Sequence, residues 1–165
     1  METRALDLPH GPTIVVRPLV NGDVETVASV FGRLGPESRR RRFNGAKACL
    51  SDAELTQLAR ADATHHALVA HVVGDPRPAA LAQLVRTGRE TAEIAFVVAD
   101  EHQHHGIGSA VTRLLLDDAR AAGIKEITAL AGGENRAAVA LIRRSASILE
   151  IRLEGPEQSI RAAIA

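Results

Sequence analysis

Aromatic residues are almost absent from this chain of 165 residues, which has three Phe and neither Trp nor Tyr. The core must therefore be built from Leu, Ile, Val and Ala. Hydrophobic residues make up 45% of the chain and charged residues 24%, which is ordinary for a soluble globular protein. The length corresponds to about one domain and is sufficient to bury a core.

The chain also has little cysteine and no formal net charge. Cys49 is the only cysteine, which excludes an internal disulfide and a cysteine-rich zinc site. The formal net charge is zero, so the overall charge does not indicate a nucleic-acid-binding surface. No stretch is apolar and long enough to span a membrane, and the first residues lack the apolar segment of a signal peptide. We expect a cytoplasmic protein that binds neither nucleic acid nor membrane; the oligomeric state is left open.

The pattern of apolar residues and turn residues divides the chain into short elements. Residues 1–12 contain Pro9, Gly11 and Pro12 and are expected to form a loose arm before a single domain over 13–165. Asn21 is a candidate helix cap, and Ser51 with Glu54 three residues later forms a capping box. The patterns predict strands over 13–18, 66–73, 79–86, 91–99, 126–130 and 148–153, and helices over 21–33, from Ser51, over 106–122 and over 135–144.

The order of these elements predicts the fold class. The short breaks between the strands at 66–99 indicate antiparallel hairpins, and a β–α–β–α–β succession follows them. The prediction is an α/β fold with a mixed, mostly antiparallel sheet and helices on both faces.

A glycine-rich turn joins the strand at 91–99 to the helix at 106–122. Gly106 and Gly108 flank the helix start, where backbone N–H groups have no intrahelical partner and the helix dipole is positive. Glycines allow a bulky anion to approach, so the turn can hold a pyrophosphate. The alternatives are a strand–helix connection that uses Gly for packing and a dinucleotide-binding G-x-G-x-x-G motif. The latter fails at its third glycine, where Val111 stands, and in its context.

The segment Gln103–Gly108 matches at every defined position the motif Gln/Arg-x-x-Gly-x-Gly/Ala of GNAT acetyltransferases. The order of elements over about residues 13–153 also resembles that family. The strand 92–96 (AEIAF) is similar to the corresponding strand of bacterial protein-lysine acetyltransferases. The resemblance implies a GNAT fold, acetyl-CoA as cosubstrate and an amine as acceptor.

The resemblance also implies which residues bind the cosubstrate. Val98 and its neighbour Val97 stand where the family pairs backbone groups with the pantetheine arm, and Asn135 stands where an asparagine often contacts the pantetheine. Backbone amides between Gln103 and Ser109 are expected to hold the pyrophosphate, and the Ser109 hydroxyl is a further donor. The residues of this loop are Gln103, His104, His105, Gly106, Ile107, Gly108 and Ser109.

Glu93 is the candidate catalytic residue. The family places a general-base glutamate at its position. Independently of the family, strand periodicity puts Glu93 on one face with Ala95 and Val97. We expect a carboxylate between such neighbours on a central strand to be partly desolvated, which suits a proton acceptor. The alternative is a solvent-exposed glutamate on an edge strand.

Two positions depart from the family. A Tyr that often serves as acid for the departing thiolate is replaced by Ile142, and Ala146-Ser147 replaces a usual Gly-Phe. The histidines of the loop do not complete a metal site with a carboxylate pattern, so we expect no metal. The basic stretch Arg39–Arg42 has two readings, a solvated charged surface or a border of the acceptor site or of the CoA 3′-phosphate.

The sequence therefore predicts an N-acetyltransferase that moves the acetyl group of acetyl-CoA directly to a primary amine in a ternary complex. By resemblance the acceptor is a lysine of a protein. A small-molecule amine is the alternative acceptor, and a non-catalytic acyl-CoA sensor is the alternative outside the enzyme class.

Overall fold

A computed structural model describes residues 2–43, 45 and 47–164. One eight-stranded sheet runs through it in the order β1-β2-β3-β4-β5-β6-β8-β7. Among the described strands, β5 and β6 pair in parallel and all other neighbours are antiparallel. The strands are β1 (Arg4–Asp7), β2 (Thr13–Pro18), β3 (His65–Val72), β4 (Pro78–Arg86), β5 (Thr91–Val98), β6 (Glu126–Gly132), β7 (Ser147–Glu154) and β8 (Glu157–Ala163). The helices are α1 (Val24–Gly32), α2 (Pro36–Phe43), α3 (Asp52–Leu58), α4 (Ile107–Ala121) and α5 (Arg136–Arg143), and residues Asp100–His102 form the 3₁₀ turn η1.

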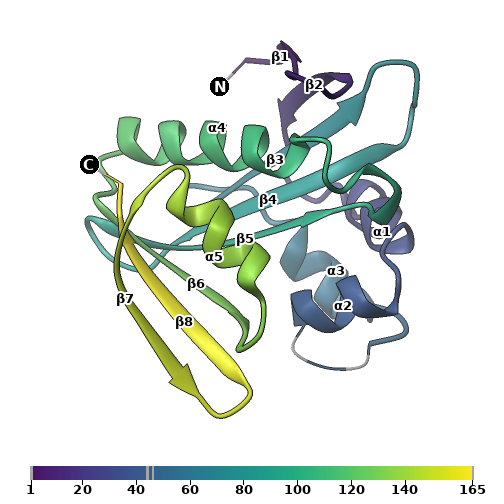
Figure 1. Ribbon diagram of the computed structural model, residues 1–165. Coiled ribbons are helices and arrows are strands. Elements are labelled where there is room, and N and C mark those ends of the chain that lie inside the picture. The colour runs from purple at the N-terminus through teal and green to yellow at the C-terminus, as the bar shows by residue number, and fades with distance from the viewer. Residues whose placement is uncertain (1, 44, 46, 165) are drawn as a thin grey trace.

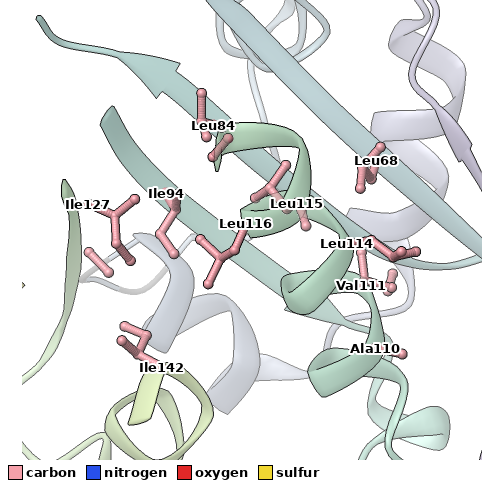
Figure 2. Close-up of a cluster of buried hydrophobic side chains, with 14 of the residues drawn as sticks. Leu68, Leu84, Ile94, Ala110, Val111, Leu114, Leu115, Leu116, Ile127 and Ile142 are labelled. Carbon is pink, nitrogen blue, oxygen red and sulfur yellow. The ribbon is translucent and has the colours of Figure 1, made fainter. Parts of the chain in front are cut away.

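Helices cover both faces of the sheet (Figure 1). The apolar stripe of α4 packs on β3, β4 and β5 and forms the main core with residues such as Leu115, Ile94 and Ile127, which Figure 2 shows. On the other face, Val27 and Val30 of α1 pack against Leu81 of β4, with side chains of α3 beside them. The predicted α/β fold, with a mostly antiparallel sheet between two layers of helices, is confirmed.

Three local expectations were wrong. Residues 4–7 form the edge strand β1 instead of part of a loose arm, because Leu6 and Leu8 pack against the core. The cap of α1 is Asp23, whose side chain accepts from the backbone N–H of Thr26, while Asn21 instead accepts from the backbone N–H of Ala61. An additional strand, β8, follows the strand that was expected to be the last. The basic stretch, for which no element was predicted, lies in the helix α2.

The capping box of α3 is present, with the Ser51 side chain accepting from the Glu54 amide and the Glu54 side chain accepting from the Ser51 amide. No helix among the described residues is both long and apolar enough to cross a membrane.

Candidate functional site

The centre of the sheet opens where β5 leaves β6. Their parallel register ends with Ile94 opposite Ala129, while β5 continues to Val98 alongside β4. β6 meanwhile continues to Gly132 beside β8. The last residues of β5 therefore have a ladder partner on the β4 side only, and a ligand can pair with their other edge.

The glycine turn follows directly and ends at the start of α4. Gly106 occupies the N-cap position in a left-handed conformation (φ 84°), and no side chain among the described residues caps this end. The N–H groups of the first turn are thus available to an anion. Gly108 lies within that turn, and a Cβ there would meet Val98 Cγ2 at 3.4 Å and Leu141 Cδ2 at 3.9 Å. The missing side chain keeps open the space between the helix start, β5 and α5.

Gln103, the first residue of the motif, holds the turn rather than pointing away from it. Its amide Nε2 donates to Val98 O at 3.1 Å and to Ser38 Oγ at 3.0 Å. These bonds connect the end of β5 with α2 and with the turn. A phosphate-binding turn needs a fixed backbone, because backbone N–H groups hold the ligand and must point toward it.

A cavity of about 430 Å³ lies between these elements. Eight of the predicted site residues line it, and Glu93, His105 and Ile107 do not. Ile107 is fully buried in the core, and His105 is exposed. The lining residues that were predicted are Val97, Val98, Gln103, His104, Gly106, Gly108, Ser109 and Asn135.

Asn135 reaches the cavity from the start of α5. It is the N-cap of that helix, and its Oδ1 accepts from the Ala138 amide at 3.1 Å, which leaves its Nδ2 for a ligand. The nearly buried Gln158 of β8 donates to the backbone oxygen of Gly132 at 2.9 Å and so fixes the turn before Asn135. Gln158 was not predicted from the sequence, because a lone polar residue in a short strand gives no signal of burial.

Glu93 lies on the central strand β5, as predicted, but its side chain is exposed. The expected partial desolvation was wrong: Ala95 and Val97, its neighbours on this face of β5, are half-buried, but Glu93 itself is exposed. Glu93 stands opposite Val85 of β4 and Thr128 of β6. The half-buried Arg42 of α2 is near enough that the Glu93 carboxylate raises its pKa, against a larger lowering by burial.

The basic stretch is divided between two environments. Arg41 and Arg42 line the cavity, and Arg42 also donates to Gln83 Oε1 at 2.9 Å. Arg39 lies over the Phe31 ring at 4.6 Å, and Arg40 contacts Glu37. Two of the four arginines therefore lie beside the site. The sequence could not predict which two, because the four residues are identical.

An ion-pair cluster holds the segment before the glycine turn. The guanidinium of Arg33, which is only 7% exposed, contacts Asp75, Glu101 of η1 and His102 Nε2. Because a guanidinium only donates, His102 Nε2 accepts this bond. A backbone hydrogen bond from Arg77 lowers the pKa of Asp75 most, and Arg33 lowers it further. Arg33 thus connects α1 and the β3–β4 turn to the start of the glycine turn.

Ile142, which stands at the family's Tyr position, is fully buried in the core (Figure 2). The neighbouring Leu141 lines the cavity instead. Neither side chain can give up a proton. Cys49, an alternative source of a proton, is exposed and does not line the cavity.

Comparisons with known proteins show the family to which the chain belongs. The model of the acetyltransferase (GNAT) family matches residues 31–146. The chain is 31% identical over 134 residues to acetyltransferase PA5475 of Pseudomonas aeruginosa, covering 79% of this chain and 72% of that protein. It is 31% identical over 130 residues to acetyltransferase Pat of Mycolicibacterium smegmatis, covering 77% of this chain but only 39% of that longer protein.

The structure superposes on the GNAT domain of S. lividans PAT with a TM-score of 0.86, at 23% identity and with 98% of this chain and 96% of that chain covered, which shows a shared fold. The chain belongs to the GNAT family of acetyl-CoA-dependent acetyltransferases.

Proposed function

We propose that this acetyltransferase moves the acetyl group directly to a primary amine of a protein, a lysine side chain, in a ternary complex. The observation that carries the proposal is the arrangement around β5. The end of this strand borders the 430 Å³ cavity at Val97 and Val98, and the same strand presents Glu93 to solvent. A cosubstrate and an amine can therefore approach β5 from different directions.

The residues present fit acetyl-CoA. The uncapped start of α4 offers N–H donors to the pyrophosphate, and Ser109 adds a hydroxyl. The backbone edge of Val97 and Val98 beyond the β6 pairing fits the amide-rich pantetheine arm as an added strand. Backbone donors there would also polarise the thioester carbonyl, since they would point at the oxygen on which charge develops.

Glu93 is the proposed proton acceptor for the amine. Val97 is the fourth residue after Glu93 along the strand, so about 13 Å separates the two residues. A side chain cannot bridge that distance to an amine beside the thioester, so the proton must travel through ordered water. The exposure of Glu93 supports such a relay, because water reaches its carboxylate.

The exposed position of the base also supports a macromolecular acceptor. A lysine is a flexible chain that can extend from a protein surface to an open face of the sheet. The charge of Arg41 and Arg42 at the cavity opposes a polycationic small amine more than a single lysine ammonium.

Turnover of acetyl-CoA against an amine panel tests the proposal. The panel contains lysine-bearing proteins and peptides, spermidine and small primary amines, with CoA release and product mass as readouts. Glu93→Gln should lower kcat/KM by about 10²–10⁴-fold and leave acetyl-CoA affinity unchanged. The matched control is Glu90→Gln, an exposed glutamate just before β5.

Three outcomes would contradict parts of the proposal. Preference for spermidine or a small amine would show that the acceptor is a small molecule instead of a protein. Binding of acetyl-CoA without turnover of any amine would indicate an acyl-CoA sensor. If the activity of Glu93→Gln stays within a few fold of the wild type, Glu93 is not the general base.

A further inference from the structure

The edge strand β7 exposes large apolar side chains at the end of the sheet. It pairs with β8 alone, and Figure 1 shows it on the outer side of a hairpin that projects beyond α5. Leu153 is 70% exposed, Leu149 52% and Ile151 40%. They are three of the seven large hydrophobic side chains that are exposed in the described part of the chain. An apolar edge with free backbone groups is a site at which another strand can pair.

The charges on β7 do not protect this edge against its own copy. Edge strands are commonly guarded by charges that repel an identical strand. Here Glu150 and Arg152 have opposite signs and stand symmetrically on either side of Ile151. Leu149 and Leu153 are the next residues outward on each side. The sequence from Leu149 to Leu153 therefore reads the same in both directions, with the two charges exchanged. The pairing of β7 with β8 is regular from Glu150 to Glu154 and shifts register between Ile148 and Glu150, so the pairing of the proposed interface rests on the regular part.

That pattern is what an antiparallel pairing of two identical strands requires. A two-fold axis through Ile151 places Ile151 opposite Ile151 of the partner subunit. It places Glu150 opposite Arg152 of the partner subunit and, by symmetry, Arg152 opposite Glu150 of the partner subunit. Opposite charges facing each other across an antiparallel pair are favourable, and here the pair occurs twice.

The hairpin also turns the backbone of Ile151 toward the free edge. The loop Gly155-Pro156 has two residues, and Gly155 has a φ of 64°, as in the turns that close tight hairpins. Such a turn makes Glu154 and Glu157 a hydrogen-bonded pair, and the pairs then alternate along the strand. Counting back from Glu154, the N–H and C=O of Ile151 point away from β8. The centre of the proposed pairing thus has its backbone groups available.

We propose that two copies of this chain associate through β7 in antiparallel register centred on Ile151, which joins their sheets into one. Within one copy, Arg152 Nε lies 2.7 Å from Glu150 Oε1, and Arg161 of β8 lies 3.5 Å from the other Glu150 oxygen. Association adds the partner's carboxylate to the Arg152 guanidinium, which has donors left for it. This surface is separate from the residues that line the cavity, so the proposal does not rest on the catalytic roles proposed above.

Sedimentation velocity on the full chain, over a range of concentrations from about 1 to 500 µM, is the first test. The expected result is a reversible change from the 17.5 kDa monomer to twice that mass. Ile151→Lys places two like charges on the axis and should weaken the dimer at least tenfold, an effect of about 1.4 kcal/mol or more. Val20→Lys changes another exposed apolar residue, which lies outside β7, and should leave dimerisation unchanged. A chain that stays monomeric at every concentration would overturn the proposal, as would an Ile151→Lys variant that dimerises like the wild type.

Charge exchange tests the register. Arg152→Glu and Glu150→Arg should each lose dimerisation, because every facing pair then has one sign. A mixture of these two variants should form the heterodimer, since each facing pair is again opposite, and native mass spectrometry distinguishes it from homodimers. The double variant E150R/R152E should again form a homodimer. If the single variants lose dimerisation and neither the mixture nor the double variant restores it, this register is refuted.

A cross-link gives a readout that does not depend on affinity. Hydrogen-bonded antiparallel partners have Cα atoms about 5.5 Å apart, within the range that a disulfide spans. Ile151→Cys in a Cys49→Ser background should form a covalent dimer on mild oxidation, and Val20→Cys in the same background should not. If both variants or neither variant cross-link, the two-fold contact at Ile151 is wrong.

Discussion

Replacing Gly108 separates the requirements of the fold from those of the ligand. Gly108 lies in the first turn of α4, where the fold has no need of a glycine, since the position is helical and a Cβ there would make ordinary contacts at 3.4 Å or more. Alanine is preferred over glycine in a helix by about 0.5–1 kcal/mol. For a chain of this size that gain raises the melting temperature by roughly 1–4 °C. Gly108→Ala should therefore stabilise the unliganded protein.

The same methyl group should weaken acetyl-CoA binding. It projects toward Val98 and Leu141, into the space through which a pyrophosphate would reach the helix N–H groups. A hydrogen bond to a charged group contributes about 1.5–3 kcal/mol. The loss of one such bond corresponds to roughly a 10–100-fold rise in Kd. Gly108→Glu adds a like charge and should raise Kd by more than about 100-fold.

Calorimetric titration and thermal melts measure the two effects on the same samples. Acetylpantetheine lacks the pyrophosphate, so the advantage of acetyl-CoA over acetylpantetheine should shrink in both variants. Gly32→Ala is the matched control, because it lies in α1 with no atom within 4 Å of its Cβ, and it should not change affinity. Wild-type acetyl-CoA affinity in Gly108→Glu would show that the pyrophosphate binds elsewhere.

Three further predictions concern electrostatics. Arg33→Ala leaves Asp75 without its buried partner, so it should lower the free energy of unfolding by about 2 kcal/mol. Urea unfolding measures this change, and a change below about 0.5 kcal/mol would contradict a structural role for the cluster. Lys47 and then Ser51 lower the pKa of Glu54 to about 2, so Glu54 stabilises the fold above about pH 4.5 and this stabilisation is lost as the pH falls toward 2. The melting temperatures of Glu54→Gln and the wild type should therefore differ at pH 7 and converge near pH 2. Finally, kcat should rise with pH and then stay constant up to about pH 9.5, because no side chain at the Ile142 position can act as an acid. A reversible fall of kcat near pH 8 would reveal a hidden acid.

The elements that sequence analysis predicted have strong local signals. The stripe of apolar residues along α4 has a helical period, and the glycines before it mark the turn. The capping box at Ser51 and Glu54 was recognisable from two residues. The loop motif predicted the part of the cavity lining around the start of α4, because backbone N–H groups, rather than distant side chains, form that part of the site.

The elements that were missed are held by tertiary contacts. The helix α2 has the sequence PESRRRRF and no apolar stripe; its Phe43 meets the Phe31 ring at 5.4 Å, and Arg39 lies over the same ring. The strand β8 (EQSIRAA) is short and largely polar, and it forms by insertion between β6 and β7. The exposure of Glu93 depends on how far the helices of the other face extend over β5, which no pattern within β5 encodes.

The insertion of β8 connects the site to the proposed dimer surface. Gln158 of β8 stands opposite Leu153 of β7, and its side chain donates to the backbone oxygens of Gly132 and Asn135. One strand thus holds the β6–α5 turn on one side and the exposed edge of β7 on the other. Because each such hydrogen bond contributes about 0.5–1.5 kcal/mol, the two bonds oppose separate movement of the turn and the hairpin. Association through β7 would then stabilise the position of Asn135 at the cavity, so acetyl-CoA should bind more tightly to the dimer than to an Ile151→Lys monomer. By linkage, acetyl-CoA should in turn favour dimerisation by the same factor.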